Sequence, residues 1–318
     1  MTFRTEIPIS KTKNPIDYNS TIVSLGSCFA VNIAEKLDYL KFDSAVNPFG
    51  ILFHPLALER FIGFAINNKV FTDSDVFFHN ERWHCFHSHS DLSHSDKETL
   101  INTLNKRTES TNQKIHKSTH IIITLGTAWV YRDNVSQTVV ANCHKLPHNQ
   151  FKKELLSVRT ISESIQNTIE LIKSRNPAVQ LIFTISPVRH IKDGFVENQQ
   201  SKSHLITALN QTLQTINCNP NAAYFPSYEI MMDELRDYRF YSEDMLHPNQ
   251  TAIDFIWKRF CDTWILETEF TIMDKVQGIQ KGLAHRPFNE ASKSHQNFLS
   301  KLQANISEIQ KDFPHIIF

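Results

Sequence analysis

The sequence has no excess of charge of either sign, since Lys and Arg together number 33 and so do Asp and Glu. Balanced charge gives no indication of a nucleic-acid or anionic-membrane partner. The chain also lacks an apolar run long enough to span a membrane, and residues 1–8 lack the apolar region of a signal peptide. Its five scattered cysteines form no CxxC pair. Such cysteines favour reduced thiols, and we expect a cytoplasmic protein.

What the sequence does contain is the pattern of an α/β domain. Short apolar and β-branched segments near residues 22, 122, 182 and 223 predict buried strands. Helical patterns separate these segments, so we predict a parallel sheet covered by helices on both faces. The expected helices begin at or just after Ser27 and at Pro248, and cover about residues 55–67, 93–118, 151–175 and 200–216.

Three segments follow from the same pattern. Residues 1–20 are polar and form an expected N-terminal arm, residues 21–265 form the α/β domain, and residues 266–318 form a helical extension packed on it. Within the domain, residues 70–92 predict two short strands or an irregular excursion. Residues 128–131 and 138–141 flank a turn and predict a β-hairpin.

The turn from the first strand to the first helix carries the first candidate site. Gly26, one of only seven glycines, allows a tight strand-to-helix turn, and Ser27 follows at the start of the helix. Serine at this position is either a helix N-cap or an exposed nucleophile. Because Ser27, Gly126 and Ser186 each follow a strand, the three residues are expected to share one edge of the sheet, where ligands collect.

A second candidate lies after the last strand. Asp244 and His247 are three residues apart, a spacing that brings both side chains to one side of a turn. A serine nucleophile needs a base, and the base needs an acceptor that fixes its tautomer. The order Ser27, Asp244, His247 matches a serine hydrolase on an α/β sheet.

The run Gly26-Ser27-Cys28-Phe29-Ala30 resembles the motif of the GSCFA domain family, which belongs with the SGNH (GDSL-like) hydrolases. The resemblance extends over residues 20–265 through the segments at 47–50, 125–128, 186–190 and 244–248. It implies a three-layer α/β/α, flavodoxin-like fold and an ester hydrolase or acyl-transfer site. By position it makes Ser27 the nucleophile, His247 the general base and Asp244 the carboxylate that orients the base.

The chain departs from the SGNH pattern at the oxyanion hole. A Gly-x-Asn normally supplies an amide donor, whereas this chain has Gly126, Thr127 and Ala128. The remaining expected donors are the Ser27 N–H, Asn47, Gly50 and the Thr127 hydroxyl. Loss of one such donor costs about 2.7–4 kcal/mol, so a non-catalytic binding or scaffold protein on the same fold stays open as the alternative.

The full set of expected oxyanion and substrate contacts comprises Gly26, Asn47, Gly50, Gly126, Thr127, Arg189 and His190. Arg189 and His190 follow Ser186-Pro187 on the same edge, where they bind an acidic or sugar substrate or belong to a solvated loop. A small acyl ester of a carbohydrate is our expected substrate class, and the sequence indicates no cofactor.

Two rival sites are weaker. The histidines between residues 79 and 94 invite a zinc site, but they lack the paired spacing of structural zinc ligands, and we expect no metal. Cys28 is a candidate nucleophile as well, although Ser27 occupies the turn. We therefore expect Cys28 to be a small buried residue of the first helix.

Overall fold

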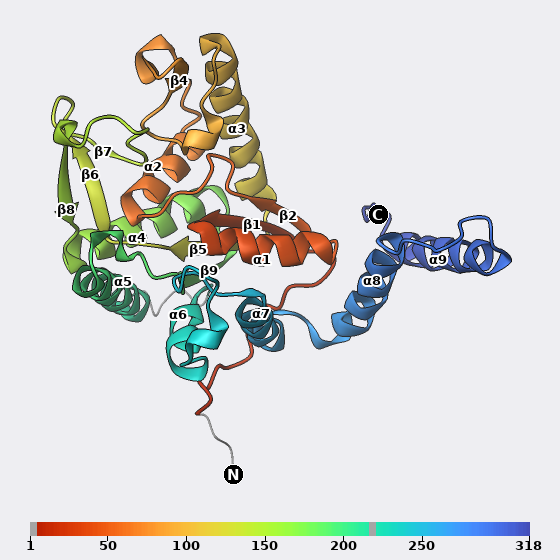
Figure 1. Cartoon of the computed structure of the whole chain (residues 1–318). Helices are drawn as coiled ribbons and strands as arrows, with labels where there is room; N and C mark the ends of the chain where they lie inside the picture. The colour runs from red at the N-terminus through yellow and green to blue at the C-terminus, as the bar shows by residue number, and fades with distance from the viewer. Residues whose placement is uncertain (1–4, 216–220) are drawn as a thin grey trace.

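The computed structural model describes residues 5–215 and 221–318, so Cys218 and the end of the helix expected over 200–216 lie outside the described residues. Five parallel strands form the central sheet in the order β10-β9-β5-β1-β2. Their bounds are Thr21–Gly26 (β1), Asp43–Val46 (β2), His120–Leu125 (β5), Gln180–Ile185 (β9) and Ala222–Phe225 (β10). The prediction of a three-layer α/β/α fold is confirmed (Figure 1).

Alternate residues of the central strands enter two separate cores. Ile121 and Ile123 pack into the core on one face of the sheet, whereas Ile122 packs into the core on the other face. This alternation arises because successive side chains of a strand point to opposite faces. The first core includes residues of Pro55–Ile66 (α2), Lys97–Lys117 (α3), Val158–Arg175 (α4) and Phe195–Thr215 (α5). The second core includes residues of Cys28–Tyr39 (α1) and Gln250–Trp264 (α7).

The strand order creates a topological switch point. From β1 the chain runs to β2 at one edge of the sheet and then returns to β5 on the other side of β1. In such sheets ligands bind in the crevice at the carboxyl ends of the two strands where the order reverses. Ser27 follows β1 and Gly126 follows β5, so both lie at this crevice.

Two small antiparallel sheets and several short helical turns add to the central domain. Phe77–His79 (β3) and Arg82–His84 (β4) form a hairpin, and Trp129–Asp133 (β6), Val139–Val140 (β7) and Phe151–Leu155 (β8) form a sheet in the order β7-β6-β8. Short helical turns lie at Asp73–Asp75, Ser90–Leu92, His148–Gln150, Ile191–Asp193, Ser227–Glu229 (α6), Ile230–Glu234, Tyr238–Phe240 and Glu267–Glu269.

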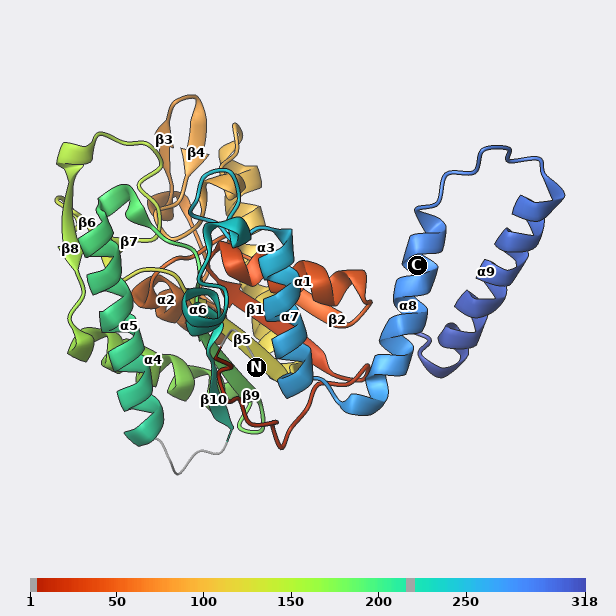
Figure 2. The ribbon, with the colours of Figure 1, turned by 60° about the horizontal axis from the view of Figure 1, so that its bottom comes forward.

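A helical hairpin of Phe270–Leu283 (α8) and Lys293–Asp312 (α9) stands out beside α1 and β2 (Figures 1 and 2). Its apolar residues join the core on the α1 side, and Phe313 approaches Tyr18 with ring centroids 5.3 Å apart. Gln280 Nε2 also donates a hydrogen bond to the Tyr39 carbonyl at 2.9 Å. Within residues 5–215 and 221–318, none of the helices has the length and apolar character to cross a bilayer.

The structure differs from the prediction at the starts of two helices and in one additional strand. The helix expected over 151–175 begins only at Val158, because Phe151–Leu155 is a strand that pairs along its whole length with β6. The helix expected over 200–216 already starts at Phe195. The edge strand β2 was not predicted, since its residues are half-buried or exposed and form no apolar run.

Gly26 determines how the first strand ends. Its φ is +132°, and a Cβ added there would lie 2.1 Å from the Thr124 carbonyl oxygen. Both the backbone conformation and the close contact therefore exclude a side chain. Beyond it, Ser27 N–H donates to the same Thr124 carbonyl at 3.0 Å, so the pairing of β1 with β5 continues into the turn.

We predict that Gly26→Ala lowers the free energy of unfolding by about 3 kcal/mol or more, from backbone strain and overpacking. The control is Gly278→Ala in α8, where an added Cβ meets no atom within 4 Å. This control is expected to be neutral or stabilising by up to about 1 kcal/mol. Urea unfolding of both variants measures the difference, and equal midpoints would contradict the role given to Gly26.

Candidate active site

Ser27 occupies the N-cap position of α1, but its side chain does not cap the helix. The residue is fully buried, and its Oγ has no hydrogen-bond partner among residues 5–215 and 221–318. Buried hydroxyls are nearly always paired. An unpaired one at the switch point of the sheet therefore marks Ser27 as a candidate functional residue.

Gly126 forms the floor between Ser27 and His190. A Cβ added to Gly126 would lie 3.0 Å from the Ser27 Cβ and 3.5 Å from the His190 Nε2. The absence of a side chain thus lets both residues approach one small space. The Gly126 N–H donates to the Phe53 carbonyl at 2.8 Å, which fixes this turn against the segment after β2.

Asp244 and His247 form a hydrogen-bonded pair. His247 Nδ1 lies 2.6 Å from Asp244 Oδ2, and Oδ1 accepts the backbone N–H groups of His247 and Leu246 at 3.0 and 2.9 Å. These amides, and then the imidazole, lower the pKa of Asp244 to about 2. The carboxylate is therefore ionised at neutral pH, and it holds His247 with Nε2 directed away from it.

Arg189 joins this loop to the end of β9. Its N–H donates to the Leu246 carbonyl at 3.2 Å, its Nη2 donates to the Met245 carbonyl, and its guanidinium lies 4.8 Å from the Tyr241 ring centroid. Arg189 thus contacts the loop that carries Asp244 and His247. No hydrogen bond joins Ser27 Oγ to His247, because that hydroxyl has no partner in the described part of the chain.

The backbone N–H groups of Ser27, Asn47 and Gly50, the expected oxyanion donors, are all engaged, and that of Asn47 donates to the Ser24 carbonyl at 2.9 Å. Ser27 N–H donates to Thr124, and Gly50 N–H donates to the Asn47 carbonyl at 2.8 Å. The Thr127 hydroxyl is likewise engaged, since it accepts the Trp129 N–H of its own turn and lies 3.1 Å from Ser201 Oγ on α5. The Asn47 side chain differs, because its Oδ1 accepts the Gly26 N–H at 2.8 Å while its buried Nδ2 has no partner in the described structure.

Lys202 is a central residue that the sequence analysis missed. It is fully buried, and its Nζ donates to the carbonyls of Gly126 at 2.8 Å and Ser186 at 2.7 Å, which ties the ends of β5 and β9 together. Burial lowers its pKa to about 7. The sequence feature that could have indicated its burial is its helical spacing from Leu205 and Leu209, which are buried on the same face of α5.

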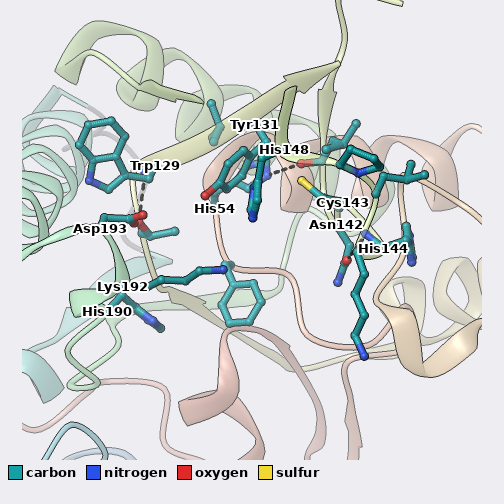
Figure 3. A pocket seen from close by; sticks show the side chains of 18 residues that line it. His54, Trp129, Tyr131, Asn142, Cys143, His144, His148, His190, Lys192 and Asp193 are labelled. Carbon is teal, nitrogen blue, oxygen red and sulfur yellow. Dashed lines mark hydrogen bonds between the residues drawn. The ribbon is translucent and has the colours of Figure 1, made fainter. Parts of the chain in front are cut away.

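A cavity of about 630 Å³ opens beside this crevice (Figure 3). His190 and Lys192 lie on one wall, and Asn142, Cys143 and His144 lie on the opposite one. The remaining lining includes Phe53, His54, Thr127, Trp129, Tyr131, His148 and Asp193. The cavity is large enough for the alcohol part of an ester as well as a small acyl group.

Histidines in and after the β3–β4 hairpin, where the sequence suggested a zinc site, form hydrogen bonds with the protein. His84 lies 2.7 Å from Ser93 Oγ and 2.9 Å from the His79 carbonyl, and His89 Nδ1 accepts the Asp91 N–H. Across the described residues there is no group of three metal-ligating side chains. Cys28 is half-buried, and burial raises the pKa of its thiol, which disfavours the reactive thiolate.

Together these features define an α/β/α protein with a buried serine at its switch point, unpaired among the described residues, and an Asp–His pair on another loop. The chain belongs to the GSCFA family, whose model matches residues 21–260. The C-terminal domain of GSCFA domain proteins matches residues 276–318, which hold most of the α8–α9 hairpin.

The sequence matches none of the curated proteins. Among solved structures, the chain is similar to an acetyl xylan esterase (Est2A) from the rumen bacterium Butyrivibrio proteoclasticus, with a TM-score of 0.36 and 11% identity. The match covers 79% of this chain and 64% of that one. The chain thus spans less than two thirds of that protein, and the likeness is too distant to assign an activity.

We predict that the Asp244 carboxyl titrates at about pH 2 when followed by carbon NMR. In His247→Ala the backbone N–H groups remain, so the pKa should rise only partly and stay below the ordinary 3.8. Because the folded pKa lies below the unfolded one, the stability that this group contributes is complete above about pH 4 and is lost as pH falls toward 2. A wild-type midpoint at the ordinary value would contradict this geometry.

Proposed function

We propose that the protein is a serine-dependent ester hydrolase or O-acyl transferase of the SGNH type. The observation that carries the proposal is the buried, unpartnered Ser27 hydroxyl, within the described chain, at the switch point of the sheet. The Asp244–His247 pair supplies a base and its orienting carboxylate on a loop bonded to the end of β9. Serine, base and carboxylate are the three groups that acyl transfer requires.

In the proposed reaction Ser27 Oγ attacks the ester carbonyl while His247 Nε2 takes the hydroxyl proton. Asp244 stabilises the resulting imidazolium without taking a proton itself. The tetrahedral intermediate then expels the alcohol, which receives the proton from His247. Water or a sugar hydroxyl attacks the acyl-serine in the same way and regenerates Ser27. The Asn47 Nδ2 is the proposed donor to the oxyanion, because it is buried and free of partners in the described structure.

In the proposed complex the His247 loop moves so that Nε2 reaches the Ser27 hydroxyl. Catalytic hydrogen bonds are often long or absent without substrate and tighten in the complex. The loop is exposed at Asp244 and His247, with side chains 44% and 50% accessible, so the adjustment requires no unpacking of the core.

We propose a small acyl ester of a carbohydrate as the substrate. The cavity that His190 and Thr127 line offers the aromatic side chains of Trp129 and Tyr131 together with polar groups from Asn142 and Asp193. Aromatic faces combined with a few polar groups suit a polyhydroxylated ring.

A binding protein without catalysis is the second candidate. The engaged N–H groups of Ser27 and Gly50 favour it, because neither amide is free to stabilise an oxyanion in this structure. A protein of this kind would retain the cavity and the Asp244–His247 pair but would not form an acyl-serine.

We predict that Ser27→Ala and His247→Ala each lower the rate of p-nitrophenyl acetate hydrolysis by about a thousandfold or more. The matched controls are Ser300→Ala and His285→Ala, which alter exposed residues of the C-terminal region and should leave the rate unchanged. Steady-state kinetics of the full chain measures these effects. Hydrolysis that survives in Ser27→Ala would indicate another nucleophile, whereas a wild-type chain that does not hydrolyse the ester would favour the binding protein.

A further inference from the structure

His190 has an unsatisfied nitrogen beside Ser27. Its Nε2 is buried and, across the described ranges, has no hydrogen-bond partner, as is true of Ser27 Oγ and Asn47 Nδ2. Both residues approach Gly126, since a Cβ added there would lie 3.5 Å from His190 Nε2, 3.0 Å from the Ser27 Cβ and 3.0 Å from the Phe53 carbonyl oxygen. Buried polar atoms without partners are rare. Two such atoms beside one glycine, with His190 also lining the cavity, indicate that a polar group of a ligand binds between them.

Contacts of both its backbone and its ring hold His190 in place. The His190 backbone N–H donates to Asn198 Oδ1 at 2.8 Å, and Asn198 is itself buried on α5. The ring meets Phe53 edge-on, with centroids 5.9 Å apart and planes at 82°. Its chain neighbour Arg189 is bonded to the Asp244–His247 loop. His190 is therefore a fixed group between the serine and the cavity, which Figure 3 shows it lining.

We propose that His190 Nε2–H donates a hydrogen bond to the acyl oxygen of the substrate and to the oxyanion that forms there. In this role it works with Asn47 Nδ2 and replaces the amide donor that Ala128 cannot provide. The inference rests on the proposed function and names a further catalytic residue of the same site.

The surroundings keep this imidazole neutral. Burial, and then the positive charges of Lys202 and His247, lower the pKa of His190 to about 3. A neutral imidazole with a depressed pKa is a poor base but an effective donor to a carbonyl oxygen. This division of labour suits two histidines at one site, because His247 has the carboxylate partner that a base requires and His190 has none among the described residues.

The role adds no proton transfer to the reaction. As Ser27 Oγ bonds to the carbonyl carbon, the π electrons move to the oxygen, and the hydrogen bond from Nε2–H strengthens with the negative charge. Collapse of the intermediate returns the electrons to the carbonyl and expels the alcohol. Nε2 keeps its proton throughout.

The test compares His190→Phe with His190→Gln. Phenylalanine keeps a ring against Phe53 but removes the donor, whereas glutamine provides an N–H near the position of Nε2. With p-nitrophenyl acetate we expect kcat of His190→Phe to fall about 10²–10³-fold while KM changes little. His190→Gln should recover at least about tenfold of this loss, as one hydrogen bond to a charged group can supply. The matched control, His285→Phe, alters an exposed residue and should retain wild-type kcat.

The outcomes separate this inference from the proposed function. If Ser27→Ala abolishes hydrolysis but His190→Phe stays within about threefold of wild type, only the role of His190 is overturned. Equal losses in His190→Phe and His190→Gln would also overturn it, because the ring would then matter only for packing. Persistent hydrolysis in Ser27→Ala overturns the proposed function itself.

A measurement on the wild-type protein covers variants that do not fold. A fluorophosphonate adduct on Ser27 places a P=O oxygen where the oxyanion forms. We expect the imidazole N–H proton of His190, assigned by nitrogen labelling, to move downfield on phosphonylation. An unchanged N–H resonance in the adduct would contradict the proposed hydrogen bond.

Discussion

The close approach of Gly26 to the Thr124 carbonyl is the constraint on which the site depends. Because glycine has no side chain, β1 can stay paired with β5 through its last residue. The Ser27 N–H extends the same pairing by one residue. The chain then enters α1 at once. Ser27 is thus held rigidly by the backbone, while its hydroxyl makes no bond within the described structure and stays available for chemistry. Strand pairing therefore positions Ser27 through its backbone and leaves its hydroxyl without a structural role.

Buried polar groups hold the remaining parts of the site around this turn. Lys202 joins the carbonyl groups at the ends of β5 and β9, and Arg189 joins β9 to the loop of Asp244 and His247. Burying a lysine is costly unless its donors are satisfied, and here two carbonyl oxygens accept from it. Its charge also faces His190 and helps to keep that imidazole neutral. The same residue therefore supports the frame and the electrostatics of the crevice.

The sequence was sufficient for features that depend on local pattern. The apolar run at 121–125 predicted the central strand, and the spacing of Asp244 and His247 predicted their contact, because both are settled within a few residues. It was insufficient where distant contacts decide. The edge strand β2 pairs with β1 although none of its residues is fully buried and Asp43 and Ser44 are polar. Phe151–Leu155 forms a strand because β6 lies beside it. Lys202 looks like any helical lysine until α5 is placed against the ends of the strands. The engaged N–H groups of Ser27 and Gly50 were equally invisible, since their partners are backbone carbonyls.

The central claim is that Ser27 becomes covalently acylated, and mapping a covalent adduct tests it most directly. The full chain is treated with a labelled fluorophosphonate, digested and analysed by peptide mass spectrometry. The account predicts one adduct, on Ser27 in the peptide that contains Gly26-Ser27-Cys28, and slower labelling when His247 is replaced by alanine. An adduct on another residue, or equal labelling of a chain that lacks the Ser27 hydroxyl, would contradict it.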